Sequence, residues 1–194
     1  MLQSKSDVGL IYCGQEIFNA DTGKLWRVNK PVLRGDLRGK FLEGQKIGGI
    51  PVLVRKECFD RVGVFDESLS SCQDWDMWKR LSEFYEFDYV PDILTKVYLH
   101  QNQISSDLNA LIAGRARMIE KHMEEFKKYP DILATHYKRM GKLCALNKDW
   151  KQSWAWFRKA VRLNPFEILK ILAWMAIEFP AVKFSSRFKN YKKI

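Results

Sequence analysis

The stretch Gly63-Val-Phe-Asp-Glu-Ser-Leu-Ser-Ser-Cys-Gln-Asp-Trp-Asp-Met-Trp-Lys-Arg-Leu81 joins a loop to a helical pattern. Gly63 can adopt a positive φ and so end the element that precedes it. Small, turn-prone residues then lead to Gln73-Asp74, after which large apolar side chains recur at three-residue spacing. These side chains are Trp75, Trp78 and Leu81. The pattern predicts a helix that begins near residue 73 and carries a carboxylate in its first turn.

A carboxylate at this place has two roles open to it. The helix dipole and the free N–H groups of the first turn favour its ionised form, which suits a general base. Asp74 or Asp76 can equally serve as a cap that accepts hydrogen bonds from those N–H groups. Spacing alone leaves both roles open.

The motif also resembles a known family. Val62-Gly63-x-Phe65-Asp66-Glu67, followed by Gln73-Asp74-Trp75-Asp76-x-Trp78-x-x-Leu81, is similar to the acceptor-side motif of family 2 glycosyltransferases with the GT-A fold. In that family the second residue of a Glu-Asp or Gln-Asp pair is the catalytic base. The resemblance therefore implies that Asp74 is the base and Gln73 its partner.

A second element of the resemblance follows further along the chain. His100-Gln-Asn-Gln-Ile-Ser105 resembles the family's later His-x-x-x-x-Ser element, and the likeness as a whole runs from about residue 8 to 106. It implies that His100 meets the metal ion or the nucleotide diphosphate, although a lone histidine at a strand end can also be purely structural. Many members carry arginine two residues before this histidine, where the present chain has Tyr98.

The first 106 residues predict an α/β fold. Apolar runs and turn signals indicate a strand at 8–13, a hairpin over 15–28, a buried strand over 47–55, a short helix at 56–62, and strands at 84–91 and 93–100. The resemblance implies that they form a partial GT-A-like mixed sheet with flanking helices. Ser105 and Ser106 are expected to cap the next helix.

Two further features suggest an acceptor site. Residues 29–46, rich in glycine and charge, predict a mobile loop or a broken helix. In the resembled family this segment borders the acceptor cleft, so it could act as a lid. Gly48 and Gly49 could let an acceptor approach the backbone, with Trp75 stacking on a sugar ring. A tight turn and a core tryptophan are the structural alternatives.

Charge divides the chain near residue 107. Residues 1–106 carry 14 Lys and Arg against 15 Asp and Glu, whereas residues 107–194 carry 19 against 8. We therefore expect two domains, an acceptor-side domain at 1–106 and an all-α extension at 107–194.

A single helical repeat is expected inside the extension. Residues 134–167 match the spacing of a 34-residue tetratricopeptide unit, a pair of antiparallel helices. The matching positions are Tyr137, Gly141, Ser153, Phe157, Ala160 and Pro165. The pair could offer a partner groove or act as a helical buttress.

The end of the extension has an amphipathic character. An apolar helix is expected from Ile168 to Phe179, and a tail that mixes aromatic with basic residues follows it. This arrangement is typical of an interfacial membrane anchor, and equally of a packing helix with a frayed tail.

Composition and the lack of certain motifs argue against several classes of protein. The four cysteines form no CxxC pair, and they predict reduced structural thiols rather than a zinc site or a disulfide framework. The N-terminus lacks the apolar core of a signal peptide, and no apolar run reaches membrane-spanning length. No nucleic-acid recognition motif is present. We expect a cytoplasmic protein, with peripheral contact at the inner face of the membrane as an open option.

The resemblance completes the functional expectation. It implies inverting transfer of a sugar from a nucleotide sugar to a hydroxyl of a glycan or lipid-linked acceptor, in cell-surface polysaccharide or glycan synthesis, with Mg²⁺ or Mn²⁺ as cofactor. The family's nucleotide-binding half, which ends in Asp-x-Asp, has no counterpart in this sequence, so the chain could be a fragment, a split gene product with an upstream nucleotide-binding half, or a truncated reading frame. The alternative is a non-catalytic interaction or membrane-associating module derived from a truncated transferase.

Overall fold

The protein is described by a computed structural model that covers residues 7–48, 51–100 and 107–180. The chain divides into two compact units, residues 1–103 and residues 104–194. The predicted division, between residues 106 and 107, falls a few residues further along the chain. The functional roles assigned to the two parts stay predictions.

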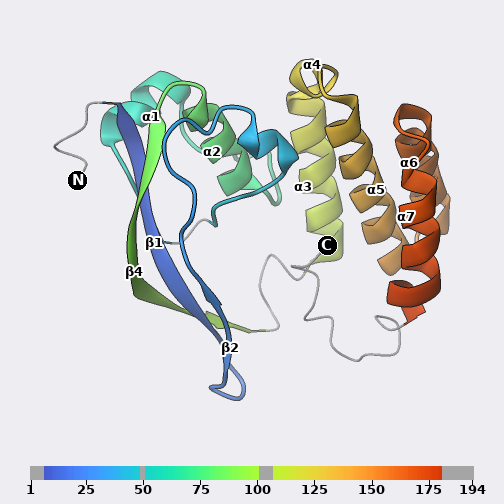
Figure 1. Ribbon diagram of the computed structural model, residues 1–194, viewed down its shortest axis with the longest axis horizontal. Coiled ribbons are helices and arrows are strands. Elements are labelled where there is room, and N and C mark those ends of the chain that lie inside the picture. The colour runs from blue at the N-terminus through green and yellow to red at the C-terminus, as the bar shows by residue number, and fades with distance from the viewer. Residues whose placement is uncertain (1–6, 49–50, 101–106, 181–194) are drawn as a thin grey trace. The chain divides into compact units, whose positions relative to one another are not determined.

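The first unit is built around one long strand, β1 (Val8–Asn19). Strand β4 (Glu86–Leu99) runs parallel to β1 along its length, and Figure 1 shows the two side by side. Strands β2 (Leu25–Asn29) and β3 (Val52–Val54) pair antiparallel with successive parts of β1 and so share its other edge. The sheet is therefore mixed and the unit is of the α/β class, while its assignment to the GT-A fold stays a prediction.

Two strands continue where the sequence predicted a break. Strand β1 runs through Gly14, between the strand expected at 8–13 and the hairpin expected from residue 15. The strands expected at 84–91 and 93–100 form the single strand β4, because a register shift opposite Cys13 and Gly14 accommodates Pro91 and Asp92. Proline is tolerated at such a bulge because no ladder hydrogen bond is required of it there. Gly14 also has to be small, since a Cβ atom would lie 3.0 Å from the Ile93 side chain. The hairpin expected over 15–28 is confirmed by the β1–β2 pairing.

Among the described residues, the first unit also contains helices α1 and α2 and the 3₁₀ turn η1. Helix α1 (Lys56–Val62) ends at Gly63, which has a φ of 78°. Helix α2 (Gln73–Ser82) begins where the apolar spacing predicts, and its tryptophans are buried. The 3₁₀ turn η1 (Lys40–Glu43) buries Phe41 completely against the Phe87 ring, with 5.5 Å between the ring centroids.

The segment between β2 and η1 makes long-range contacts with the sheet, and residues 29–46, expected as a mobile loop or a broken helix, contain the short 3₁₀ turn η1. The Tyr12 hydroxyl donates to the Leu33 carbonyl and accepts from the Leu33 N–H, both at 2.9 Å. Gly35 then forms a two-bond antiparallel bridge with Phe87 of β4. Nearby, the Arg34 guanidinium lies 4.3 Å from the centre of the Tyr89 ring. These long-range contacts place the segment across the sheet, and its role as a lid stays a prediction.

The second unit is helical. Its helices are α3 (Leu108–Lys121), α4 (Met123–Phe126), α5 (Pro130–Leu146), α6 (Trp150–Leu163) and α7 (Glu167–Ala173), and α7 continues into a π-helical turn at Trp174–Glu178. The carboxylate of Asp107 accepts from the N–H groups of Asn109 and Ala110. Asp107 is therefore the cap of α3, which corrects the expectation that Ser105 and Ser106 cap this helix; both serines lie outside the described residues.

Helices α5 and α6 form the closely packed pair that the repeat spacing predicts. The Ser153 hydroxyl donates to the Gly141 carbonyl at 2.9 Å. A Cβ atom at residue 141 would lie 2.3 Å from the Phe157 ring, so only glycine permits this approach. The relation of the pair to tetratricopeptide repeats stays a prediction. Within the described parts of the chain, no helix is both long and apolar enough to cross a membrane.

Candidate functional site

The start of α2 is held by contacts from the loop before it. Cys72, at the N-cap position, has a φ of 71°, a left-handed conformation that residues other than glycine rarely adopt. The Gln73 side-chain amide donates to the Leu69 carbonyl at 2.7 Å, which ties the helix to that loop. Strained backbone of this kind persists only where surrounding contacts enforce it, and it is frequent at functional sites.

Asp74 follows in the first turn, and both of its carboxylate oxygens accept hydrogen bonds. The Trp75 N–H donates to Oδ1 at 2.9 Å, and the Gln45 side-chain amide donates to Oδ2 at 2.5 Å. Gln45 lies 29 residues earlier in the chain, so the tertiary structure brings this donor to the carboxylate. Asp74 remains partly exposed and lies in the first turn of α2, at the positive end of the helix dipole.

The second carboxylate of the Asp74-Trp75-Asp76 sequence has a different environment. Asp76 is fully buried, and its Oδ2 accepts from Arg80 Nε at 2.9 Å. The same guanidinium donates to the carbonyls of Val62 and Val64. The pair thus fastens α2 to the end of α1, which is a structural role.

The tryptophans of α2 are core residues. Trp75 is 1% exposed and its indole N–H donates to the Phe41 carbonyl at 2.6 Å. Trp78 is equally buried and its indole N–H donates to the Gly48 carbonyl at 3.3 Å. Trp75 therefore occupies the core position that its spacing indicates. The burial of Trp75 gives no support to its predicted contact with an acceptor. Gly48, the other residue in these contacts, lies next to α2 through its hydrogen bond with Trp78.

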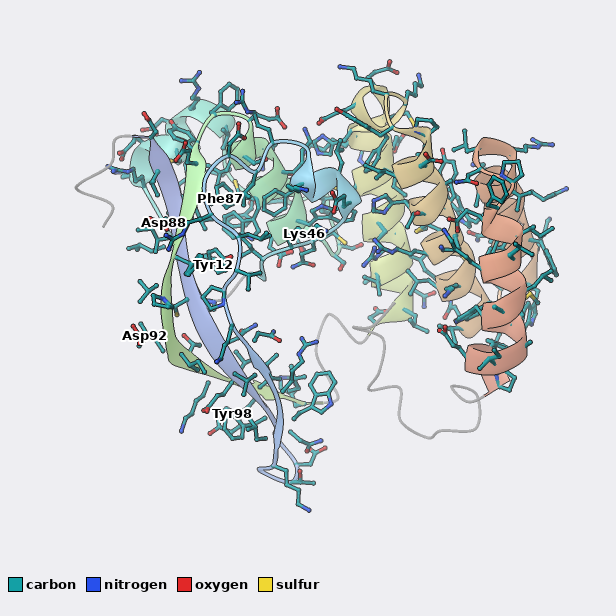
Figure 2. The ribbon with its side chains drawn as sticks, viewed as in Figure 1. Tyr12, Lys46, Phe87, Asp88, Asp92 and Tyr98 are labelled. Carbon is teal, nitrogen blue, oxygen red and sulfur yellow. The ribbon has the colours of Figure 1, made fainter. Side chains whose placement is uncertain are left out.

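A groove of about 380 Å³ lies beside these residues, between the sheet and the segment after η1. Figure 2 labels one lining residue from each side of the groove: Tyr12 lies on β1, and Lys46 lies on the segment after η1. Lys46 is also paired with Glu43 at 2.7 Å. The groove is lined by Tyr12, Cys13, Gln15, Val28, Asn29, Lys30, Pro31, Lys46, Ile47, Gly48 and Pro51. Lys46 and Gly48 follow closely after Gln45, so the segment that contacts Asp74 also forms one wall of the groove.

His100 lies directly after β4 and is exposed. No group of three or more His, Cys, Asp or Glu side chains suited to a metal ion occurs within residues 7–48, 51–100 and 107–180. His100 therefore supplies one imidazole and no ready-made metal site. Gly49, the other glycine proposed to contact an acceptor, lies outside the described residues.

Two of the cysteines, Cys58 and Cys144, are buried and unsuited to nucleophilic chemistry. Burial raises the pKa of the Cys58 thiol, and it raises the pKa of the Cys144 thiol to about 11. A thiol with a raised pKa carries little of the reactive thiolate at neutral pH. The expectation of structural thiols agrees with these environments.

Sequence reasoning missed Gln45, Lys46 and Tyr12. Gln45 and Lys46 stand between Gly44 and Gly48, just before a predicted buried strand, and this polar pair between glycines was the available signal. Tyr12 sits in an apolar run and carries no comparable signal, because its role depends on a segment that folds back over it.

Comparison with known proteins supports only a coarse assignment of the chain's activity. No protein-family model matches it. It is similar to an uncharacterized glycosyltransferase of Rickettsia prowazekii (strain Madrid E), with 31% identity over 105 residues. The match covers 50% of this chain and 32% of the relative, so the chain spans about a third of the length of the curated relative that it matches. The similarity agrees with the coarse assignment to glycosyltransferases and leaves the family 2 and GT-A assignments as predictions.

Proposed function

We propose that this chain is the acceptor-side part of a family 2, GT-A glycosyltransferase that moves a sugar from a nucleotide sugar to an acceptor hydroxyl. The observation that carries the proposal is the setting of Asp74. Its carboxylate lies at a helix N-terminus, accepts from Gln45 and from the Trp75 N–H, and adjoins the segment that walls a groove. The similarity to a named glycosyltransferase supports the same activity.

The chemistry of such a site is a single inverting displacement. Asp74 takes the proton of the acceptor hydroxyl while that oxygen forms a bond to the anomeric carbon. The bond from this carbon to the nucleotide diphosphate breaks on the opposite face, and the diphosphate leaves with the electron pair. General-base assistance of this type contributes about 10²–10⁴-fold to the rate. Gln45 would keep the carboxylate oriented without taking part in proton transfer.

The groove is the proposed place for the acceptor. Among its lining residues, Gln15, Asn29 and Lys46 offer side-chain donors, and the amides offer acceptors as well. A hydroxyl-rich molecule, such as a glycan or the sugar of a lipid-linked acceptor, can use both kinds of group. Gly48 and Gly49 remain proposed sites of close backbone approach.

A divalent ion, Mg²⁺ or Mn²⁺, is part of the expectation for the complete enzyme. His100 alone does not fit a metal site, since such ions take several oxygen ligands. We therefore propose that His100 contacts the diphosphate, which an imidazole N–H can do as a donor, and we assign no step to the metal. We propose that the nucleotide-binding part of the enzyme lies outside the matched third of the relative's length, on the same or another chain. We also propose that the enzyme acts in polysaccharide synthesis in the cytoplasm, at the inner face of the membrane.

The test is reconstitution of transfer. The chain is assayed with a panel of nucleotide sugars and Mn²⁺, first alone and then with the product of an adjacent upstream reading frame. We expect transfer in the mixture, and we expect Asp74→Asn to reduce its rate about 10²–10⁴-fold while the far-UV circular dichroism stays unchanged. Absence of both transfer and nucleotide binding in every combination would contradict the proposal.

The matched control is Asp60→Asn. Asp60 is an exposed carboxylate on α1 and has no part in the groove. The replacement changes the net charge as Asp74→Asn does, so it should leave transfer intact. Equal losses in the two variants would mean that charge rather than the base role of Asp74 matters.

A non-catalytic interaction module is the second candidate, and features of the helical unit favour it. A cavity of about 430 Å³ opens on α3, α5 and α6, with Tyr137 and Trp156 in its lining. Such a cavity could seat a partner segment. Nucleotide binding by the reconstituted mixture separates the two candidates, because only the transferase requires it.

A further inference from the structure

Helix α7 has an unusual distribution of side chains. Its inward positions at Glu167, Ile171 and Trp174 are 1–3% exposed, so a carboxylate lies on the buried side. Large apolar side chains occupy the outward positions instead, with exposures from 47% to 75%. They are Phe166, Ile168, Leu169, Leu172 and Ile177, and we call this set the α7 outer face. A helix of a water-soluble domain normally shows the reverse arrangement.

The orientation of α7 is fixed by specific contacts. The Glu167 carboxylate forms ion pairs with Lys138 of α5 at 2.5 Å and with Lys170 at 2.7 Å. On the same side, Ile171 and Trp174 join Ala145 and Phe157 in one buried cluster. Because these contacts hold the inward side, the helix cannot turn its leucines into the core. The α7 outer face is therefore a stable feature of the unit.

The charge of the helical unit indicates what would cover this face. The described residues 107–180 carry 14 Lys and Arg against 8 Asp and Glu. Lys170 lies on the exposed side of α7, with 61% of its side chain accessible. A second copy of the chain would bring the same excess of positive charge to the interface, which opposes self-association. An anionic surface complements it.

We propose that the α7 outer face binds an anionic lipid surface. In this arrangement α7 lies in the plane of the interface, its apolar side chains enter the headgroup boundary, and Lys170 with other cations of the helical unit meets acidic headgroups. Both contributions are needed, because apolar insertion supplies most of the affinity and charge supplies the preference for anionic lipid. The inference does not depend on the proposed transferase activity.

The experiment is co-sedimentation of the full chain with vesicles. Two preparations are compared, phosphatidylcholine alone and phosphatidylcholine mixed with phosphatidylglycerol. We expect binding to the anionic vesicles that decreases at high salt, and weak binding to the neutral ones. The double variant Leu169→Gln/Leu172→Gln should weaken binding to the anionic vesicles by about tenfold or more, because it removes two inserting side chains.

Leu53→Gln is the matched control. Leu53 is 63% exposed, close to the 65% of Leu169, but lies on β3 of the other unit. It should change vesicle binding by about twofold or less. Thermal unfolding followed by circular dichroism verifies that all variants fold, as expected for changes at exposed positions.

Three results would overturn the proposal. One is failure of the full chain to bind anionic vesicles. Another is binding that the double variant leaves intact, which would assign it to charge alone. The third is a wild-type chain that dimerises and does not bind vesicles, together with a double variant that stays monomeric, since the α7 outer face would then join two copies.

Discussion

At the scale of single residues, two aspartates two positions apart have different environments. Asp74 stays partly exposed and accepts from Gln45, whereas Asp76 is fully buried and accepts from Arg80. The helix turns by about 200° between the two positions, so their side chains leave it in different directions. Asp76 therefore holds α2 to the end of α1, whereas Asp74 is partly exposed and remains the proposed base.

This difference predicts opposite effects of the same substitution. Asp76→Asn should lower the free energy of unfolding by about 3 kcal/mol, because it leaves the largely buried Arg80 guanidinium without its counter-charge. Asp74→Asn should change stability far less and act on transfer instead. Urea unfolding of both variants, with Asp60→Asn as the exposed control, measures the contrast. A stability loss at residue 74 as large as that at residue 76 would contradict the division of roles.

At the scale of elements, α7 shows how a buried charge can set a helix orientation. Burial alone would raise the pKa of the Glu167 carboxyl, but hydrogen bonds from Lys138 and Lys170 outweigh it and the pKa is lowered from its ordinary value of 4.5. A carboxyl with a lowered pKa in the folded state contributes stability above its unfolded pKa. That contribution is lost as the pH falls through the folded pKa.

The helical unit should therefore lose stability in acid through this group. Between about pH 5 and pH 3 we expect the free energy of unfolding to fall, and Glu167→Gln should be less stable at neutral pH and show a flatter dependence over that range. Chemical unfolding at a series of pH values, followed by the helical circular dichroism signal, measures both effects. Glu120→Gln is the control, since its pair with Arg117 is exposed. An identical pH profile for Glu167→Gln and the native chain would refute the role.

Strand elements show where local signals misled the prediction. Gly14 and Pro91 look like strand breakers, yet both are accommodated at one bulge between β1 and β4. A bulge depends on two strands that lie far apart in sequence, so no local pattern distinguishes it from a break. The helix at residue 73 and the α5–α6 pair were predictable because helical spacing is set by near neighbours.

At the scale of the whole molecule, the chain consists of two compact units, each with its own core. In residues 104–194 one buried cluster contains side chains from α5, α6, α7 and the π-helical turn after α7. They are Ala145, Phe157, Ile171 and Trp174. We expect residues 104–194, expressed alone, to give a helical circular dichroism spectrum and a cooperative thermal transition. A fragment without such a transition would show that the unit needs the rest of the chain to fold.

The sequence by itself determined the helical segments, the hairpin and the place of Asp74 in a first turn, because periodicity, glycine and proline act through residues close in the chain. Only the tertiary structure decided that Gln45 reaches Asp74, that the segment after β2 is bound to Tyr12 and Phe87, and that the leucines of α7 face outward. Each of these features depends on contacts between side chains that are far apart in the sequence. Such contacts form only when the core packs and buried charges pair, so local preference does not determine them.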